Sequence, residues 1–182
     1  MKRILAVICV FSVLPLLAED TPGPSWWQGW KSNLRATWES DDHAVIVPLN
    51  IYHVRSTYTR ERIERYNEMP WGLGFERYHT NSSRNRHSFY VLAFSDSYAR
   101  VQSNVGYAWE KSCFLDNAGD MRIGLGFNAT VAFRYRQDYL PFPGVIPMIS
   151  LNYKCLSLQT TWVPYIGPSN GNVFLTMFKV AI

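Results

Sequence analysis

A histidine and an adjacent Asp-Ser pair are the residues of this 182-residue sequence best suited to catalysis. His53 follows one apolar segment, and Asp96 and Ser97 follow another. A histidine can accept a proton from an attacking oxygen, and polar neighbours can orient the reacting groups or stabilise developing charge. Such residues near loops are more often structural than catalytic. If these residues are catalytic, His53 would be the general base, Ser97 a polar catalytic partner and Asp96 an orienting or electrostatic group.

The adjacency of Asp96 and Ser97 limits how they can act together. Neighbouring residues on a strand point to opposite faces of the sheet, so both face His53 only if the strand distorts or ends there. A Ser-His-Asp relay of the familiar geometry is therefore not assured. The remaining histidines are scattered and form no metal-ligand pattern with cysteines or carboxylates. We expect neither a metal nor another cofactor.

The elements that must position these residues have the alternation of β-strands. In Arg122–Tyr135, apolar and aromatic residues alternate with small or polar ones, as expected for a strand between lipid and a lumen. Comparable segments bring the expected number of strands to about eight: Val45–Arg55, Trp71–Tyr78, Phe89–Tyr98, Asn104–Glu110, Met148–Tyr153, Leu156–Val163 and Val173–Ile182.

Closure of these strands into an antiparallel barrel would remove exposed sheet edges. A soluble ligand-binding barrel is the alternative, with its apolar faces turned inward. Alternation alone cannot assign inside and outside. Residues 1–18 resemble an export signal, and aromatic residues lie near the strand ends. Both features favour an outer-membrane barrel. The predicted fold is therefore all-β: an eight-stranded antiparallel outer-membrane β-barrel with an N-terminal amphipathic helix.

Three segments divide the chain. Residues 1–18 have a short basic start and an apolar stretch too short for a confident membrane span, which is typical of a secretory signal peptide. Residues 19–41 contain a helix at Ser25–Ser40, capped by Ser25, whose tryptophan-rich stripe is suited to a bilayer interface or, alternatively, to a soluble core. Residues 42–182 form the predicted barrel.

The composition agrees with a lipid-facing protein and argues against nucleic acid as a partner. Aromatic residues make up 15% and charged residues 18% of the sequence. The formal charge of +4 falls to +2 when the two basic residues of the leader are removed. Since no concentrated basic stripe exists, we expect no nucleic-acid binding.

Five separated motifs resemble the lipid A palmitoyltransferase family, PagP. They are P-x-x-x-x-H at Pro48–His53, R-Y-N-E-x-P-W-G-x-G-F at Arg65–Phe75, A-F-x-D-S at Ala93–Ser97, G-L-G-F at Gly124–Phe127 and N-G-N-V at Asn170–Val173. The resemblance extends from about Trp26 to the C-terminus. A set of separated matches is far more specific than any one motif.

The resemblance implies an outer-membrane acyltransferase that moves a palmitoyl, or slightly shorter, chain from a glycerophospholipid to the hydroxyacyl chain of lipid A. His53, Asp96 and Ser97 match the family's catalytic positions, at the outer-leaflet rim. The alternatives are a phospholipase with water as acceptor and a non-enzymatic structural or adhesive barrel. Whether an acyl-serine forms is left open. We expect a monomer or homodimer.

Four prolines are expected to mark two lateral openings. Proline cannot donate to a ladder, so each one interrupts a wall in which every other backbone group must pair. The family uses matching prolines to admit lipids sideways. The two expected openings are assigned to Pro48 with Pro70 and to Pro147 with Pro164.

The length of the transferred chain is expected to depend on two small residues, Gly106 and Ala108, which alternation turns inward. The resemblance places a chain-measuring pocket in the barrel, with a glycine where this sequence has Ala108. The extra methyl group predicts an optimum slightly shorter than palmitoyl. Val173, Leu175 or Met177 would offset the extra methyl group if they leave more room in the pocket. The alternative is that Ala108 faces the lumen without contacting the substrate.

Two cysteines of the predicted barrel, Cys113 and Cys155, are expected near turns on the inner side of the membrane. The periplasm permits disulfides. A bond between separate turns requires close approach of the two Cα atoms. The sequence therefore leaves both a disulfide and two free thiols open.

Overall fold

The computed structural model describes residues 26–165 and 171–182. The expected signal peptide at 1–18 and the expected helix cap at Ser25 lie outside these residues. The described elements are α1 (Trp26–Glu39), β1 (His43–His53), α2 (Arg60–Ile63), β2 (Gly72–Thr80), β3 (Asn85–Ser95), β4 (Val101–Phe114), β5 (Met121–Arg134), the 3-10 turn η1 (Tyr135–Gln137), β6 (Phe142–Tyr153), β7 (Leu156–Val163) and β8 (Val173–Ala181).

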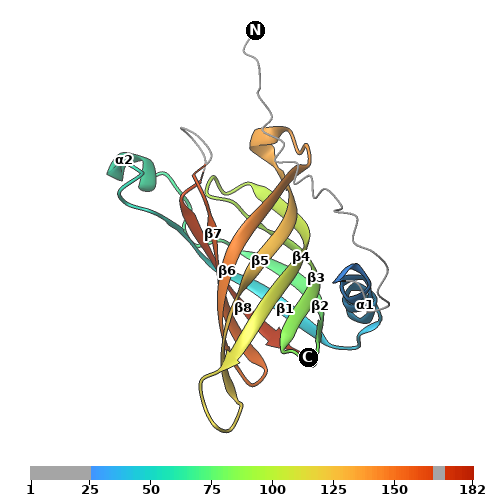
Figure 1. Cartoon of the computed structure of the whole chain (residues 1–182). Coiled ribbons are helices and arrows are strands. Elements are labelled where there is room, and N and C mark those ends of the chain that lie inside the picture. Colours follow the sequence, from blue (N-terminus) through green and yellow to red (C-terminus); the bar gives the residue numbers. More distant parts are fainter. Residues whose placement is uncertain (1–25, 166–170) are drawn as a thin grey trace.

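Within the described residues, eight strands form one closed antiparallel barrel (Figure 1). Each strand pairs with the next one along the chain, and β8 pairs back to β1. The predicted fold class is confirmed. Large apolar side chains project from the outer wall, and Leu73, Leu125 and Val145 are each more than 60% exposed. This arrangement contradicts a soluble barrel with apolar faces inward and fits a wall that faces lipid.

The lumen is apolar toward the end of the barrel that carries His53. Ile46, Ile51, Leu92, Phe94 and Met177 form one buried cluster, against which partly buried Tyr90, Val173 and Leu175 pack. These residues come from β1, β3 and β8. An apolar interior beside His53 has the chemistry required to hold an acyl chain.

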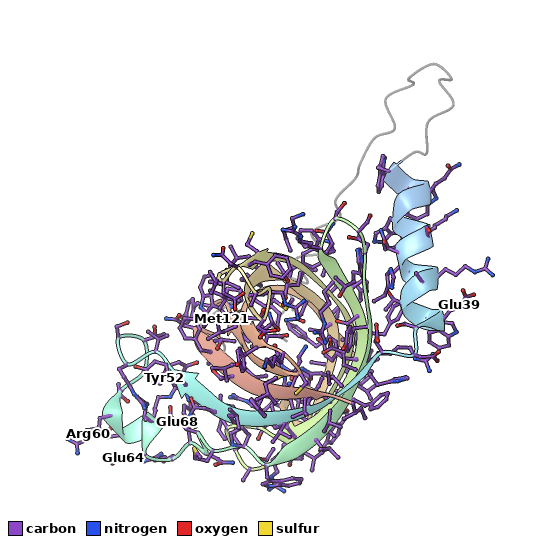
Figure 2. The ribbon with its side chains drawn as sticks, turned by 90° about the horizontal axis from the view of Figure 1, so that it is seen from below. Glu39, Tyr52, Arg60, Glu64, Glu68 and Met121 are labelled. Carbon is purple, nitrogen blue, oxygen red and sulfur yellow. The ribbon has the colours of Figure 1, made fainter. Side chains whose placement is uncertain are left out.

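The opposite half of the lumen is filled by polar and charged side chains. Glu76 is fully buried and accepts hydrogen bonds from Arg86, at 2.9 Å, and from Lys179. Glu110 accepts hydrogen bonds from Ser112 and Ser150, at 2.9 and 2.7 Å. The network satisfies these buried groups and closes the lumen with side chains (Figure 2).

Helix α1 lies outside the barrel and packs on β2 and β3 (Figures 1 and 2). Thr37 faces the wall and is fully buried, and Asn81 donates to the Asn33 side chain. Trp26 and Trp38, by contrast, are 76% and 68% exposed. The Trp38 ring meets Phe89 of β3 edge-on, while much of its surface stays exposed. Contact of the helix with a bilayer interface stays a prediction. No described helix is long and apolar enough to cross a membrane.

The ladder between β1 and β2 is interrupted at the His53 end of the barrel. Pairing runs from His43 opposite Arg77 to Ile46 opposite Gly74 and stops there. Val47 and then Pro48 follow in β1. The next recorded backbone link on this side is the bond from the Ile51 N–H to the carbonyl of Glu68, in the loop between the strands. A seam is thus present beside Pro48.

A second interruption separates β6 from β7. Their pairing runs only from Tyr153 opposite Leu156 to Met148 opposite Thr161, although β6 begins at Phe142. Pro147 occupies the first unpaired position of β6, and Pro164 follows the end of β7. Because proline lacks an N–H donor, both seams lie where the sequence weakens pairing. Their role in lipid passage stays a proposal.

The disulfide expected as one possibility between Cys113 and Cys155 is absent, since both are free, exposed cysteines. Cys113 lies on β4 opposite Ile123 of β5, which in turn faces Leu151 of β6. Cys155 lies in the turn after β6. Strands are about 4.8 Å apart, so β5 and β6 separate the two residues by more than the roughly 7 Å that a disulfide allows between Cα atoms.

Candidate active site

A β-bulge aims His53 into the lumen. In the first half of β1, Ala44, Ile46 and Pro48 are the buried residues. The register with β8 shifts between Pro48 and Asn50, after which the buried residues are Ile51 and His53. An extra residue in one strand inverts the faces of every residue beyond it. Without the bulge, the His53 side chain would face outward.

Ser97, in the turn after β3, meets the imidazole of His53 at the end of β1. Ser97 Oγ lies 3.0 Å from His53 Nε2, within hydrogen-bond distance. Strand β3 ends at Ser95, so Ser97 is in a turn and is not bound by the alternation of the strand. The condition stated above for Asp96 and Ser97, that the strand must end there, is met.

Asp96 has a different position from the one expected of an orienting carboxylate. Its Oδ1 accepts hydrogen bonds from the N–H groups of Tyr98 and Arg100, at 2.8 and 2.9 Å. Ala99 in this turn has a φ of 57°, a strained value for a residue with a Cβ. Asp96 therefore fastens the turn that carries Ser97, and no hydrogen bond within the described residues joins it to His53.

The carboxylate that contacts His53 belongs to Glu68. Its Oε1 lies 3.0 Å from His53 Nδ1, the ring nitrogen opposite the one that faces Ser97. Arg55 forms a bidentate ion pair with the same carboxylate, with N–O distances of 2.9 and 2.6 Å. Burial acts to raise the pKa of Glu68, but hydrogen bonds from Arg55 and His53 outweigh it and hold that pKa below its ordinary value. Glu68 is therefore ionised at neutral pH.

Aromatic side chains from the same loop cover the imidazole. Tyr66 stacks on His53 with ring centroids 4.5 Å apart, and Tyr58 contacts it edge-on at 5.1 Å. The Tyr98 hydroxyl in turn donates to that of Tyr66. His53 is only 3% exposed as a result. The aromatic cover excludes water from one side of the base while Ser97 occupies the other.

Sequence reasoning missed Glu68, Tyr66 and Tyr58 as neighbours of His53. Their loop is charged and aromatic, which is equally typical of a solvated surface. The available signal for Tyr66 and Glu68 was their place within the R-Y-N-E-x-P-W motif, which does not include Tyr58. Pairing of a loop carboxylate with a histidine 15 positions earlier is a tertiary event that local patterns do not encode.

Ala108 lies at the level where the lumen changes from apolar to polar. It is 2% exposed and stands opposite Ser88 and Asn128. Two residues nearer His53, Gly106 stands opposite Tyr90, and a Cβ on Gly106 would come within 2.9 Å of the Tyr90 hydroxyl. Two residues farther away is the buried Glu110. The inward direction expected for Gly106 and Ala108 is observed.

The predicted lumen residues of β8 fall in the apolar half. Val173 stands opposite His53, Leu175 opposite Ile51, and Met177 opposite Pro48. They therefore line the wall between the imidazole and the polar half of the lumen. None is a strand neighbour of Ala108, so they cannot offset its methyl group by direct pairing with it.

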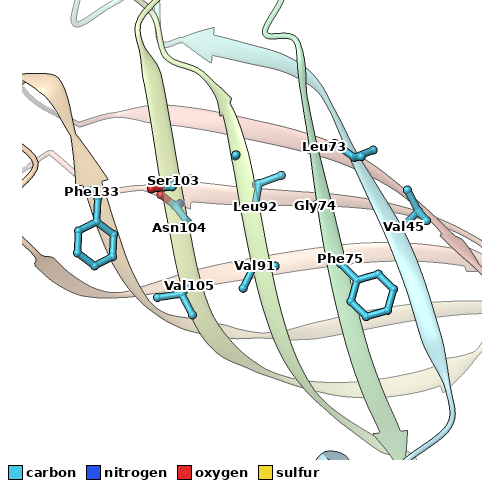
Figure 3. A pocket seen from close by; sticks show the side chains of 11 residues that line it. Val45, Leu73, Gly74, Phe75, Val91, Leu92, Ser103, Asn104, Val105 and Phe133 are labelled. Carbon is cyan, nitrogen blue, oxygen red and sulfur yellow. The ribbon is translucent and has the colours of Figure 1, made fainter.

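An apolar groove of about 430 Å³ lies on the wall formed by β1 to β5 (Figure 3). Its outward-facing residues include Leu73, Phe75, Val91 and Val105, all exposed. This groove lies on the outer surface of the wall, and its lining does not include His53, Glu68 or Ser97. Among the described residues, no group of histidine, cysteine and carboxylate side chains could hold a metal ion.

Comparison with known proteins places this geometry in a family. Residues 33–179 match the model of the family described as "Antimicrobial peptide resistance and lipid A acylation protein PagP". The chain belongs to the PagP family. The matched range contains His53, Glu68, Ser97 and all eight strands except the last two residues of β8.

Several curated relatives carry the name "Lipid A acyltransferase PagP". The protein of Laribacter hongkongensis is 41% identical over 150 residues, which are 82% of this chain and 71% of the relative. That of Pectobacterium carotovorum is 37% identical, over 96% of this chain and 82% of the relative. That of Yersinia enterocolitica is 34% identical, over 97% and 94%. Membership of the PagP family together with the closed barrel fits an outer-membrane protein.

Proposed function

We propose that this PagP-family protein is a lipid A acyltransferase that uses His53 and Ser97 to move a palmitoyl, or slightly shorter, chain from a glycerophospholipid to a hydroxyacyl chain of lipid A. The observation that carries the proposal is the 3.0 Å contact between Ser97 Oγ and His53 Nε2 at the mouth of an apolar lumen. The site thus combines a general base with a compartment for a hydrocarbon chain. Family membership supplies the acceptor class.

In the proposed reaction, His53 acts as the base at its Nε2 atom. A hydroxyl oxygen attacks the ester carbonyl carbon of the donor while His53 takes the hydroxyl proton. The bond to the glycerol oxygen then breaks, and His53 returns the proton to that oxygen, which leaves a lysophospholipid. Attack by the lipid A hydroxyl itself, or by Ser97 followed by lipid A, makes the same demand on His53. Asp96 contributes by fixing the Ser97 turn.

The two seams in the wall are proposed as the lateral openings through which lipids reach His53. Both lie toward the His53 end, beside Pro48 and Pro147. A disulfide engineered across either seam, between Val47 and Leu73 or between Ile146 and Val163, is expected to block acylation until reductant is added. The measurement is lipid A acylation by the oxidised and reduced forms of each variant. Full activity in a verified, fully oxidised variant would refute lateral access at that seam.

Ala108 is proposed as a residue of the pocket that selects chain length. Ala108→Gly should lengthen the preferred donor chain and Ala108→Met should shorten it. Overpacking a rigid interior costs about 1–3 kcal/mol, and about 1.4 kcal/mol is a factor of ten, so selectivity should change roughly fivefold to a hundredfold. Competition among phospholipids of graded chain length measures this. Unchanged profiles in both folded variants would remove Ala108 from the pocket.

Mass analysis of the lipids tests the function itself. The purified protein, placed in vesicles that contain lipid A and a phospholipid with a labelled palmitoyl chain, should yield lipid A heavier by one labelled chain, together with lysophospholipid. Free labelled fatty acid without acylated lipid A would instead establish a phospholipase. Unchanged lipids with a correctly folded barrel would leave a structural or adhesive role.

A further inference from the structure

We infer that Glu68 is a positioning residue for His53, so that Ser97, His53 and Glu68 form the working relay and Arg55 limits the negative charge that Glu68 presents. The inference rests on the proposed acyl transfer by His53 and adds to it a carboxylate that the A-F-x-D-S motif does not contain. No hydrogen bond within the described residues joins Glu68 to Ser97, so we infer that it acts through the imidazole.

The two ring nitrogens of His53 are used by two different partners. Glu68 Oε1 is 3.0 Å from Nδ1, and Ser97 Oγ is 3.0 Å from Nε2. A carboxylate can only accept, so Nδ1 carries the proton and Nε2 presents its lone pair to the Ser97 hydroxyl. This is the tautomer that a general base at Nε2 requires. When Nε2 takes a second proton during the reaction, the adjacent carboxylate stabilises the imidazolium.

The backbone fixes the carboxylate of Glu68 in place. The Glu68 carbonyl accepts hydrogen bonds from the Ile51 N–H, at 2.9 Å, and from the Asn50 side chain, at 3.0 Å. Its Oε1 also accepts from the backbone N–H of His53 at 3.2 Å. Glu68 thus binds the same stretch of β1 that carries the imidazole. Relative movement of the carboxylate and the ring is restricted from both ends.

Asp96, the other acidic residue near Ser97, is engaged elsewhere. Its Oδ1 holds two backbone N–H groups of its own turn. Glu68 is the residue whose side chain is in contact with Nδ1. A carboxylate bound to backbone N–H groups keeps its turn in shape, whereas one bound to Nδ1 determines the tautomer and charge of the base.

Arg55 opposes part of the effect of Glu68. Its bidentate ion pair with the ionised Glu68 is close to neutral as a whole, and the arginine cation also lies near the imidazole. Of the other charged side chains of this loop, Arg62 lies over the ring of Tyr58, which itself contacts His53 edge-on. Arg60 pairs with Glu64, and Figure 2 places both at the outer tip, away from Glu68. Changes at Glu68 and Arg55 should therefore move the protonation of His53 in opposite directions.

The test measures kcat, KM and the acidic limb of the pH–rate profile for Glu68→Gln. The variant keeps the size of the side chain but loses its charge, so the imidazolium loses its counter-charge. We expect kcat to fall roughly tenfold to a thousandfold, since the base itself remains, with little change in KM. We expect the acidic limb to move to lower pH by about one unit. Glu64→Gln, in the same loop, is the matched control and should match wild type in rate and limb.

Arg55→Gln provides the second arm, and its acidic limb should move to higher pH because the full charge of Glu68 then faces His53. Three results would each overturn the inference. They are a wild-type kcat in folded Glu68→Gln, a fall in its kcat without a shift of its acidic limb, and acidic limbs of Glu68→Gln and Arg55→Gln that move in the same direction. If Glu68→Gln fails to fold, an unmoved limb in Arg55→Gln overturns it alone. Activity retained by His53→Ala would instead refute the proposed function, whereas an inactive His53→Ala beside a normal Glu68→Gln refutes only the role of Glu68.

Discussion

His53→Ala is expected to reduce lipid A acylation by about 10²- to 10⁴-fold, the contribution of a positioned general base. The imidazole contacts Ser97 through Nε2 and Glu68 through Nδ1, and alanine removes both contacts at once. The substitution is at the end of β1, beyond the paired part of the β1–β2 ladder, so closure of the barrel should persist. Transfer of a labelled acyl chain to lipid A in vesicles measures the effect.

The control for this result is His79→Ala. His79 lies on β2 near Thr80, at the opposite end of the barrel from His53, and has no place in the proposed site. Heat-modifiable mobility on gels establishes that both variants form the barrel. Wild-type turnover in folded His53→Ala would remove His53 from the chemistry. Ser97→Ala should also be impaired, since it loses the hydroxyl on Nε2.

Glu76→Gln is expected to lower the free energy of unfolding by about 3–5 kcal/mol, which is the usual cost of removing one partner of a buried ion pair. Glu76 is completely buried and holds two cations, Arg86 and Lys179, which are themselves largely buried. A neutral amide leaves both positive charges in the lumen without compensation. Unfolding in denaturant, followed by tryptophan fluorescence in detergent or vesicles, measures the loss.

The double variant Glu76→Gln/Lys179→Met should recover part of that loss because it removes one of the two uncompensated cations. Asp120→Asn is the matched control. It breaks an exposed pair with Lys154 at 3.6 Å and should leave the stability close to that of wild type. Equal stability of Glu76→Gln and Asp120→Asn would contradict a structural role for the charged half of the lumen.

The sequence by itself determined the strands, the closed barrel and the family. Alternation along Arg122–Tyr135 is a local property, because side chains of a strand point to opposite faces whatever their partners. The motifs carried the positions of His53 and Ser97. Gly106 and Ala108 were correctly turned inward because β4 has no irregularity at that point.

Only the tertiary structure decided which face of each strand lies on the outside of the barrel and which side chains contact His53. Either orientation satisfies alternation, and the closed barrel resolves it by exposing residues such as Leu125. The bulge after Pro48 reverses the faces of β1, which depends on its register with β8. Sequence reasoning gave Asp96 an orienting or electrostatic role and did not find the carboxylate in contact with Nδ1, which belongs to Glu68 in a loop. Loop closure and register are set by contacts between distant segments, and no local pattern of residues contains them.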